Sequence, residues 1–389
     1  MTDAPRRVRP VIAAVLGVAL LALAIWILIP GPTYFMLTFS VGGPEVSLFY
    51  MMAAVFIIAI ALPTFRTHRA SRVGAGAAAI AFVIALTPFA RVPGTVRDFD
   101  RTFASTLGDS SAHATLSLRT LLLGVPLGDA KITRGIPIAS PGGVPLTMNV
   151  YQPTARGRYP ILVQIYGGAW MRGTPDSFKN FAQWLASRGF VVFAIDYRHA
   201  PAAHWPAQLD DTRLMLAWIR DHAPEYDGDT ARVAYMGRSA GAHLATIAAW
   251  SDVPPPLPPK AIVSYYGPVN LTESYKHPPV PDPIKVRETD EALIGGSVDQ
   301  FPAAFADASP ITHVAKATVP TLLVYGRRDH IVQPVAGHLM RDGLTAAGVT
   351  TVYLEIPWAD HGFDEVFQGP SNQLALYYTE RFLRNVLHP

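Results

Sequence analysis

The sequence contains no cysteine among its 389 residues. This absence excludes disulfide bonds, metal sites built on thiolates and a cysteine nucleophile. Charged residues are also scarce, at 16%, while 50% of the residues are hydrophobic. Such a composition excludes a disordered or fibrous protein, and the length is enough for two or three domains of the usual ~100 to 200 residues.

Acidic residues are nearly missing from the first 90 positions, where Asp3 and Glu45 stand against six arginines. This part therefore has a charge of +4, while the rest of the chain has 26 basic and 27 acidic residues and a charge of −1. The excess positive charge is thus confined to the most hydrophobic part of the chain. This distribution indicates a membrane bilayer as a partner and argues against nucleic acid.

Three uncharged apolar runs lie in this region, at about residues 11–30, 46–63 and 73–90. The first is long enough to cross a bilayer, because 20 helical residues rise ~30 Å. It ends in Ile29-Pro30 rather than in a small-residue cleavage site, which favours a retained helix over a signal peptide. We therefore predict a three-helix transmembrane anchor over residues 1–90 and a multi-pass membrane protein.

The arginines of this region predict an orientation. They precede the first run or separate the second from the third, and none lies in the first connection: Arg6, Arg7, Arg9, Arg66, Arg69 and Arg72. By the positive-inside rule, the N-terminus faces the cytoplasm and everything after the third helix is extracytoplasmic. The third run is alanine-rich and the least hydrophobic, and with only two spans the large domain would be cytoplasmic.

Small residues in the same region predict close helix packing. Gly74 and Gly76 match a dinucleotide-binding glycine pattern, but no strand precedes them and no βαβ unit surrounds them. Together with Ala13 and Gly17 in the first run, they are instead typical of helices that approach closely in a membrane.

Residues 91–131 form an amphipathic connecting segment. Two sets of apolar residues recur there at helical spacing and predict one or two short helices: Phe99, Phe103 and Leu107, then Leu118, Leu121 and Leu122. Such helices can lie on the bilayer surface, cover a substrate pocket or pack on the following domain, and the sequence does not decide among the three.

From residue 132 to 389, short apolar runs alternate with amphipathic segments. We expect strands at 146–151, 161–166, 191–195, 233–236, 261–265, 321–325 and 352–356. We expect helices at 177–188, 208–222, 240–250, 334–347 and 372–386. The alternation predicts an α/β domain with a mostly parallel sheet covered on both faces, whose active site lies beyond the carboxyl ends of the strands.

A candidate nucleophile stands at one of those ends. Ser239 is the centre of Gly237-Arg238-Ser239-Ala240-Gly241, between a predicted strand and a predicted helix. On such a sharp turn the serine projects over the sheet, and the flanking glycines let the backbone pass without a side-chain clash. The placement between strand and helix makes the short pattern informative.

A serine hydroxyl needs a base, and the base needs a group that orients it. Asp329 and His361 follow the last two predicted strands, and the chain order serine, acid, histidine is that of an α/β-hydrolase. Asp360 and Asp364 also lie near the histidine, but a close neighbour in sequence approaches its ring poorly, so Asp329 is favoured as the acid.

A glycine-rich turn follows the strand at 161–166. Tyr166-Gly167-Gly168-Ala169-Trp170 can direct backbone amides inward, as an oxyanion hole requires, and the amide of Ala240 beside the nucleophile supplies another donor. Four elements in the right order at strand ends make coincidence a poor explanation.

These motifs resemble the esterase and lipase branch of the α/β-hydrolases, which includes the hormone-sensitive-lipase-like carboxylesterases and isoprenylcysteine methylesterase, a relative with N-terminal membrane helices. The resemblance covers about residues 132–389 and rests on five segments: 166–170, 196–201, 237–243, 326–329 and 360–363. It implies an α/β-hydrolase fold and assigns site residues by role: nucleophile Ser239, base His361, orienting acid Asp329, and oxyanion donors Gly168, Ala169 and Ala240.

Tyr166 departs from the family pattern, which usually has histidine before the two glycines. A tyrosine can still hydrogen-bond and brace the turn, so Tyr166, Gly167 and Trp170 are expected to support the oxyanion donors. The substitution bears on the subfamily rather than on catalysis.

We therefore predict a membrane-anchored serine hydrolase that cleaves carboxylic esters through an acyl-enzyme, with no metal and no organic cofactor. An acyltransferase or peptidase on the same fold, or a membrane-bound interaction protein without turnover, are the alternatives. Segments 282–300 and 98–122 are the expected pocket walls. The substrate is a small-molecule or lipid ester, and neither its chain length nor the oligomeric state follows from the sequence.

Overall fold

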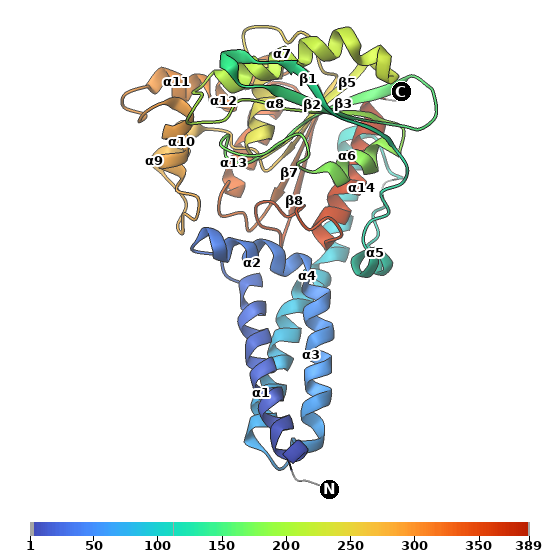
Figure 1. The fold of residues 1–389 in the computed structure, drawn as a ribbon, viewed down its shortest axis with the longest axis vertical. Helices are drawn as coiled ribbons and strands as arrows, with labels where there is room; N and C mark the ends of the chain where they lie inside the picture. Colours follow the sequence, from blue (N-terminus) through green and yellow to red (C-terminus); the bar gives the residue numbers. More distant parts are fainter. Residues whose placement is uncertain (1–3, 112, 388–389) are drawn as a thin grey trace.

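The computed structural model describes residues 4–111 and 113–387 (Figure 1). Residues 1–3 of the predicted anchor and residues 388–389 of the predicted α/β domain lie outside the described residues. Asp3, one of the two acidic residues of the first 90 positions, is among them. A three-helix stalk carries an α/β domain at one end (Figure 1). The stalk consists of α1 (Ala4–Ala24), α3 (Ser47–Ala61) and the first half of α4 (Arg69–Leu107).

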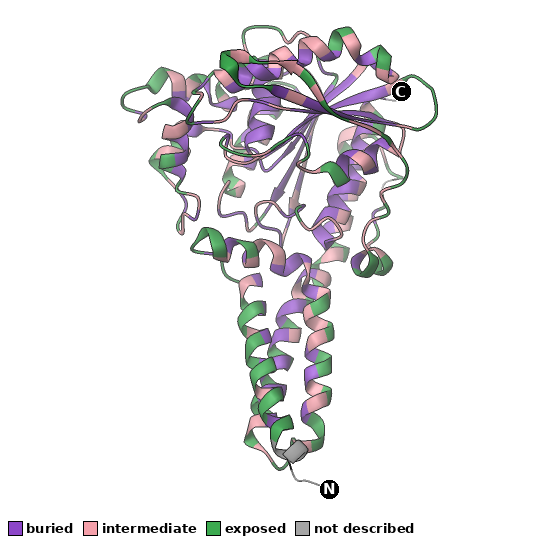
Figure 2. Cartoon of the chain, in the orientation of Figure 1, coloured by how far each residue is buried: buried purple, intermediate pink, exposed green. Residues whose placement is uncertain are grey.

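Within the described residues, three stalk helices are long and apolar enough to cross a membrane, over Val8–Ile27, Ser47–Thr64 and Arg69–Leu107. Their apolar side chains are largely exposed around the outside of the bundle (Figure 2). The first helix begins and ends earlier than the sequence pattern indicated, and the third extends well past residue 90.

Close contact between α1 and α4 depends on the absence of side chains. A Cβ atom added to Gly17 would lie 2.3 Å from the carbonyl oxygen of Gly74, and one added to Gly74 would lie 2.3 Å from that of Ala13. The expected small-residue packing is therefore present at these three positions. Gly76 has open space around it and takes no part.

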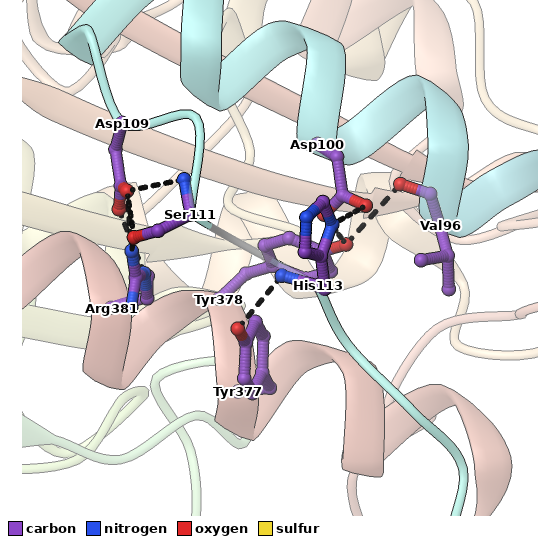
Figure 3. Close-up of polar contacts among 8 residues, drawn as sticks. All are labelled: Val96, Asp100, Asp109, Ser111, His113, Tyr377, Tyr378 and Arg381. Atoms are coloured by element: carbon purple, nitrogen blue, oxygen red, sulfur yellow. Dashed lines mark hydrogen bonds and ion pairs between the residues drawn. The ribbon is translucent and has the colours of Figure 1, made fainter.

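Helix α4 continues beyond the stalk and packs on α14 (Pro370–Leu387). The rings of Phe99 and Phe103 lie 5.3 and 5.1 Å from that of Tyr378. Tyr378 also donates a hydrogen bond to Asp100, and Arg381 donates one to Asp109 beyond the end of α4 (Figure 3). Of the three possibilities for the first apolar set of residues 91–131, packing on the following domain is the one observed.

The domain contains one eight-stranded sheet of order β1-β2-β4-β3-β5-β6-β7-β8. Its strands are β1 (Lys131–Ala139), β2 (Leu146–Gln152), β3 (Tyr159–Ile165), β4 (Val191–Ile195), β5 (Gly228–Arg238), β6 (Ala261–Tyr265), β7 (Thr321–Gly326) and β8 (Thr351–Ile356). β2 is antiparallel to both β1 and β4, and the other pairs are parallel. The predicted α/β-hydrolase fold with a mostly parallel sheet is confirmed.

Alternating side chains of the central strands divide the core into two layers. Leu162 of β3 lies in one hydrophobic cluster, while Ile161 and Val163 lie in another. The first cluster includes residues of α6 (Lys179–Ala186) and α14, and the second those of α7 (Ala207–His222) and α8 (Ala240–Trp250). The sheet is therefore covered on both faces.

Four short helices follow β6 as an insertion that the sequence analysis did not anticipate: α9 (Leu271–Lys276), α10 (Val286–Ile294), α11 (Pro302–Asp307) and α12 (Pro310–His313). The remaining α-helices in the described part of the domain are α13 (Pro334–Ala346), between β7 and β8, and α5 (Leu118–Leu123), before β1.

The connection between the first two stalk helices forms a helix of its own, α2 (Tyr34–Glu45), which the sequence analysis also did not anticipate. It lies crosswise between the stalk and the α/β domain (Figure 1). Its last residue, Glu45, is buried and accepts hydrogen bonds from the backbone amide and hydroxyl group of Ser371, at 3.0 and 2.5 Å. Burial raises the pKa of this carboxyl group to about 8.

The raised pKa predicts a pH-dependent stability. Glu45 stays protonated in the folded protein up to about pH 8 but ionises near its ordinary value of 4.5 when unfolded. The folded state therefore binds more protons between these values, and stability falls as the pH rises from about 5 to 8. We expect the thermal midpoint of the full chain to decrease over this range and to decrease less in Glu45→Gln. An equally steep decrease in the variant would contradict this.

Candidate active site

Ser239 lies on a strained turn between β5 and α8. Its φ of 51° and ψ of −122° are unusual for a residue with a side chain. A Cβ atom on Gly237 would lie 2.1 Å from the carbonyl group of Gly241, and one on Gly241 would lie 2.2 Å from the carbonyl oxygen of Ile165. Both glycines are therefore required by the close backbone approach that holds the serine out over the sheet.

The structure brings Ser239, His361 and Asp329 into one hydrogen-bonded line. His361 Nε2 lies 3.0 Å from Ser239 Oγ, and His361 Nδ1 lies 2.9 Å from Asp329 Oδ2. The other carboxylate oxygen accepts bonds from the amides of Ile331 and Val332. A carboxylate at Nδ1 favours the tautomer with its proton there, which leaves Nε2 free to accept the serine proton. Burial raises the pKa of Asp329.

The two acidic residues near His361 in sequence, Asp360 and Asp364, contact groups other than its ring. Asp360 Oδ1 lies 2.8 Å from the ring nitrogen of His330 and accepts the backbone amide of His361. Burial lowers the pKa of His330, but the hydrogen bond and charge of Asp360, together with the charge of Asp329, raise the pKa overall. Asp364 pairs with Arg238. The geometry therefore supports Asp329 as the orienting acid.

The glycine turn after β3 lies against the nucleophile. A Cβ atom on Gly167 would lie 3.1 Å from that of Ser239, and Gly168 has a φ of +132°, which favours glycine. Among the described residues, no hydrogen-bond acceptor contacts the backbone amides of Gly168, Ala169 or Ala240. Three unpaired donors thus lie beside Ser239, as stabilisation of an oxyanion requires.

A family model named BD-FAE matches residues 148–344, just over half of the chain. The chain belongs to the BD-FAE family.

The BD-FAE chain is 31% identical over 246 residues to the probable carboxylic ester hydrolase LipM of Mycobacterium tuberculosis, covering 59% of this chain and 55% of LipM. It is 32% identical over 215 residues to the esterase LipC of the same organism, covering 53% of each. The chain thus spans about half the length of these curated relatives.

Among solved structures, an esterase of Pyrobaculum calidifontis superposes with a TM-score of 0.57 at 22% identity, covering 75% of this chain and 92% of that one. This match shows the fold. Together with the family model and the two relatives, it confirms the predicted esterase and lipase branch of the α/β-hydrolases.

Tyr166, at the position where histidine was expected, braces the turn through a polar cluster in this BD-FAE protein. Its hydroxyl group donates to Asp196 at 2.6 Å and lies 2.9 Å from His199 Nε2, and its ring stacks on Tyr197 at 4.5 Å. Trp170 is held similarly, since its indole N–H donates to His243 at 3.2 Å. Both expected supporting side chains are therefore fixed by hydrogen bonds.

A buried ion pair behind the nucleophile was not predicted. Arg238, directly before Ser239, pairs with Asp364, which also accepts a hydrogen bond from Tyr266. The Tyr266 ring lies 4.6 Å from the ring of His361. The network therefore joins the serine turn to the histidine loop, and its partners are too far apart in sequence for any local pattern to reveal them.

Two cavities meet at Ser239. One, of about 320 Å³, is mainly apolar and is lined by α9, α10, α13 and the segments before them, including Val269, Val286, Val332 and Leu339. The other, of about 630 Å³, contains His361 and is lined on one side by α2. Segment 282–300 contributes to both through Ile284, as expected. Segment 98–122 was wrongly expected as a wall: within the described residues, it lines neither cavity, because its phenylalanines pack on α14.

No group of three or more histidine, aspartate or glutamate side chains that could hold a metal ion occurs within residues 4–111 and 113–387.

Proposed function

We propose that the protein is a carboxylic ester hydrolase that acts through a serine acyl-enzyme. The observation that carries this proposal is the hydrogen-bonded line from Asp329 through His361 to Ser239, beside three unpaired amides. The names of the relatives, a probable carboxylic ester hydrolase and an esterase, support an ester as the bond that is cleaved.

The proposed reaction has two matched halves. His361 takes the proton of Ser239 as the serine oxygen attacks the ester carbonyl, and the three amides bind the oxygen that becomes negative. The ester C–O bond breaks, and the alcohol leaves with the proton from His361. Water then attacks the acyl-enzyme and gives its proton to His361, after which the carboxylic acid leaves and Ser239 regains its proton. The buried Asp329 orients the imidazole and stabilises its charged form.

Labelling with a fluorophosphonate tests the nucleophile. The serine oxygen forms a bond to phosphorus and fluoride leaves, so the full chain should become labelled and lose its activity on methylumbelliferyl butyrate. Ser239→Ala should abolish labelling and lower kcat by about 10⁵-fold or more. Ser105→Ala, at an exposed position on α4, should retain both. Unchanged labelling of Ser239→Ala would exclude Ser239 as the nucleophile.

The proposed enzyme is a multi-pass membrane protein with an extracytoplasmic catalytic domain. Three apolar helices support the spans. The start of α1 and the α3–α4 turn, which carry the arginines, lie at the end of the stalk farthest from the α/β domain (Figure 1). Protease added to intact cells stripped of their outer layers should digest the domain and spare the stalk. Full protection of the domain would reverse this topology.

A further inference from the structure

Helix α2 connects the ends of α1 and α3 that adjoin the α/β domain, and β7 and β8 run toward it (Figure 1). The catalytic ends of these strands therefore face the stalk and not the opposite side of the molecule. In a membrane-anchored protein, this arrangement directs the active site toward the bilayer surface.

The inner side of α2 is part of the active-site cavity. Leu37, Thr38 and Val41 line the same 630 Å³ space as Ser239 and His361. Residues of the membrane anchor and residues of the catalytic centre therefore enclose one volume, and whatever reaches the serine through this cavity passes along α2.

Both ends of α2 are fastened to the α/β domain. At its start, the guanidinium group of Arg172 lies 4.7 Å from the centre of the Tyr34 ring, and Arg172 lies two residues after Trp170 of the oxyanion turn. At its end, Glu45 is bonded to Ser371 of α14. Both ends of the helix that lines the cavity therefore contact the α/β domain.

Exposed apolar side chains gather at this level of the molecule. Tyr34 and Phe35 of α2 are 52% and 71% exposed, and Leu118 and Leu123 of α5 are 60% and 76% exposed. Helices α2 and α5 lie at a similar height beside the top of the stalk (Figure 1). Aromatic and leucine side chains exposed at the end of a membrane span are typical of contact with the lipid interface.

We propose that the substrate is an amphiphilic ester with a long apolar chain that enters laterally from the bilayer leaflet, and that α2 is the wall along which it reaches Ser239. The chain then occupies the 320 Å³ apolar cavity beyond the serine, lined by α10 and α13. This inference rests on the proposed esterase function and adds to it the class of substrate and the role of the anchor.

Two umbelliferyl esters with the same leaving group test the inference. The full chain is reconstituted in phosphatidylcholine vesicles, and hydrolysis of methylumbelliferyl palmitate, which resides in the bilayer, is compared with that of the water-soluble acetate. Thr38→Trp places a large ring on the cavity side of α2. We expect it to lower the palmitate-to-acetate ratio of kcat/KM by about tenfold or more. Val41→Trp narrows the same cavity, and its palmitate-to-acetate ratio tests the inference if Thr38→Trp does not fold.

Phe35→Trp is the matched control, because it adds the same ring to a side of α2 that does not line the cavity and keeps an aromatic group exposed. It should leave the ratio unchanged. An unchanged ratio in both cavity variants, or the same decrease in the control, would overturn the inference. Failure of the esterase proposal looks different, since the wild-type chain would then hydrolyse neither ester and would not be labelled by a fluorophosphonate.

Discussion

Asp329→Asn is expected to lower kcat for ester hydrolysis by about 10⁴-fold. Asparagine has nearly the same shape, but its amide cannot stabilise the charged imidazole and favours the tautomer with a proton on Nε2. That nitrogen then faces the serine oxygen as a donor and cannot accept its proton. The measurement is kcat on methylumbelliferyl butyrate with the full chain in detergent micelles, with the active serine counted by fluorophosphonate labelling.

Asp360→Asn is the matched control for this experiment. Asp360 is adjacent to His361 in sequence and also carries a carboxyl group, but it contacts His330 and a backbone amide and not the ring of His361. We expect a far smaller decrease in kcat than for Asp329→Asn. If the larger loss occurred in Asp360→Asn, the orienting acid would have to be reassigned.

Asp364→Ala is expected to destabilise the α/β domain by about 3–5 kcal/mol, because it leaves Arg238 buried without a counter-charge. The rings of Phe178 and Phe181, 4.2 and 4.5 Å from the guanidinium group, still contact the cation but do not neutralise it. Urea unfolding of the full chain reports the loss through tryptophan fluorescence, since six of the seven tryptophans lie in this domain.

Two further variants separate this explanation from a general effect of removing an acid. Asp221→Ala breaks an exposed pair with Arg220 and should leave the unfolding curve unchanged. Replacing Arg238 and Asp364 together with leucine removes both charges, and should recover much of the stability that Asp364→Ala loses. A double variant no more stable than the single one would show that the ion pair itself is not the cause.

The candidate catalytic residues could be predicted because each one follows a strand. Ser239, Asp329 and His361 stand in the turns that follow β5, β7 and β8, whose apolar runs are buried in the sheet, and the ends of such parallel strands meet at one edge. The sheet itself was predictable for the same reason, except for β1. This edge strand has an irregular register and mixed exposure, so it lacks the apolar pattern of its neighbours.

The missed features depend on contacts between distant parts of the chain. Arg238 and Asp364 are 126 positions apart, and only the folded sheet brings them together. The end of α2 contains Gly42, Gly43 and Pro44, residues that usually indicate a turn, and the helix is stabilised by its position against the domain. Similarly, the charged Arg91 ends an apolar run in the sequence, but helix α4 continues past it to Leu107.

The length of α4, a single helix despite the internal Pro88 and Pro93, has a mechanical consequence. Its 39 residues span about 58 Å, roughly twice the ~30 Å thickness of a bilayer core. A helix that meets a thinner or thicker bilayer adjusts by tilting. Because the same helix that begins in the stalk packs on α14 of the α/β domain, such a tilt would turn this domain relative to the lipid surface. With the proposed membrane topology, bilayer thickness would therefore change the angle at which the candidate active site faces the lipid.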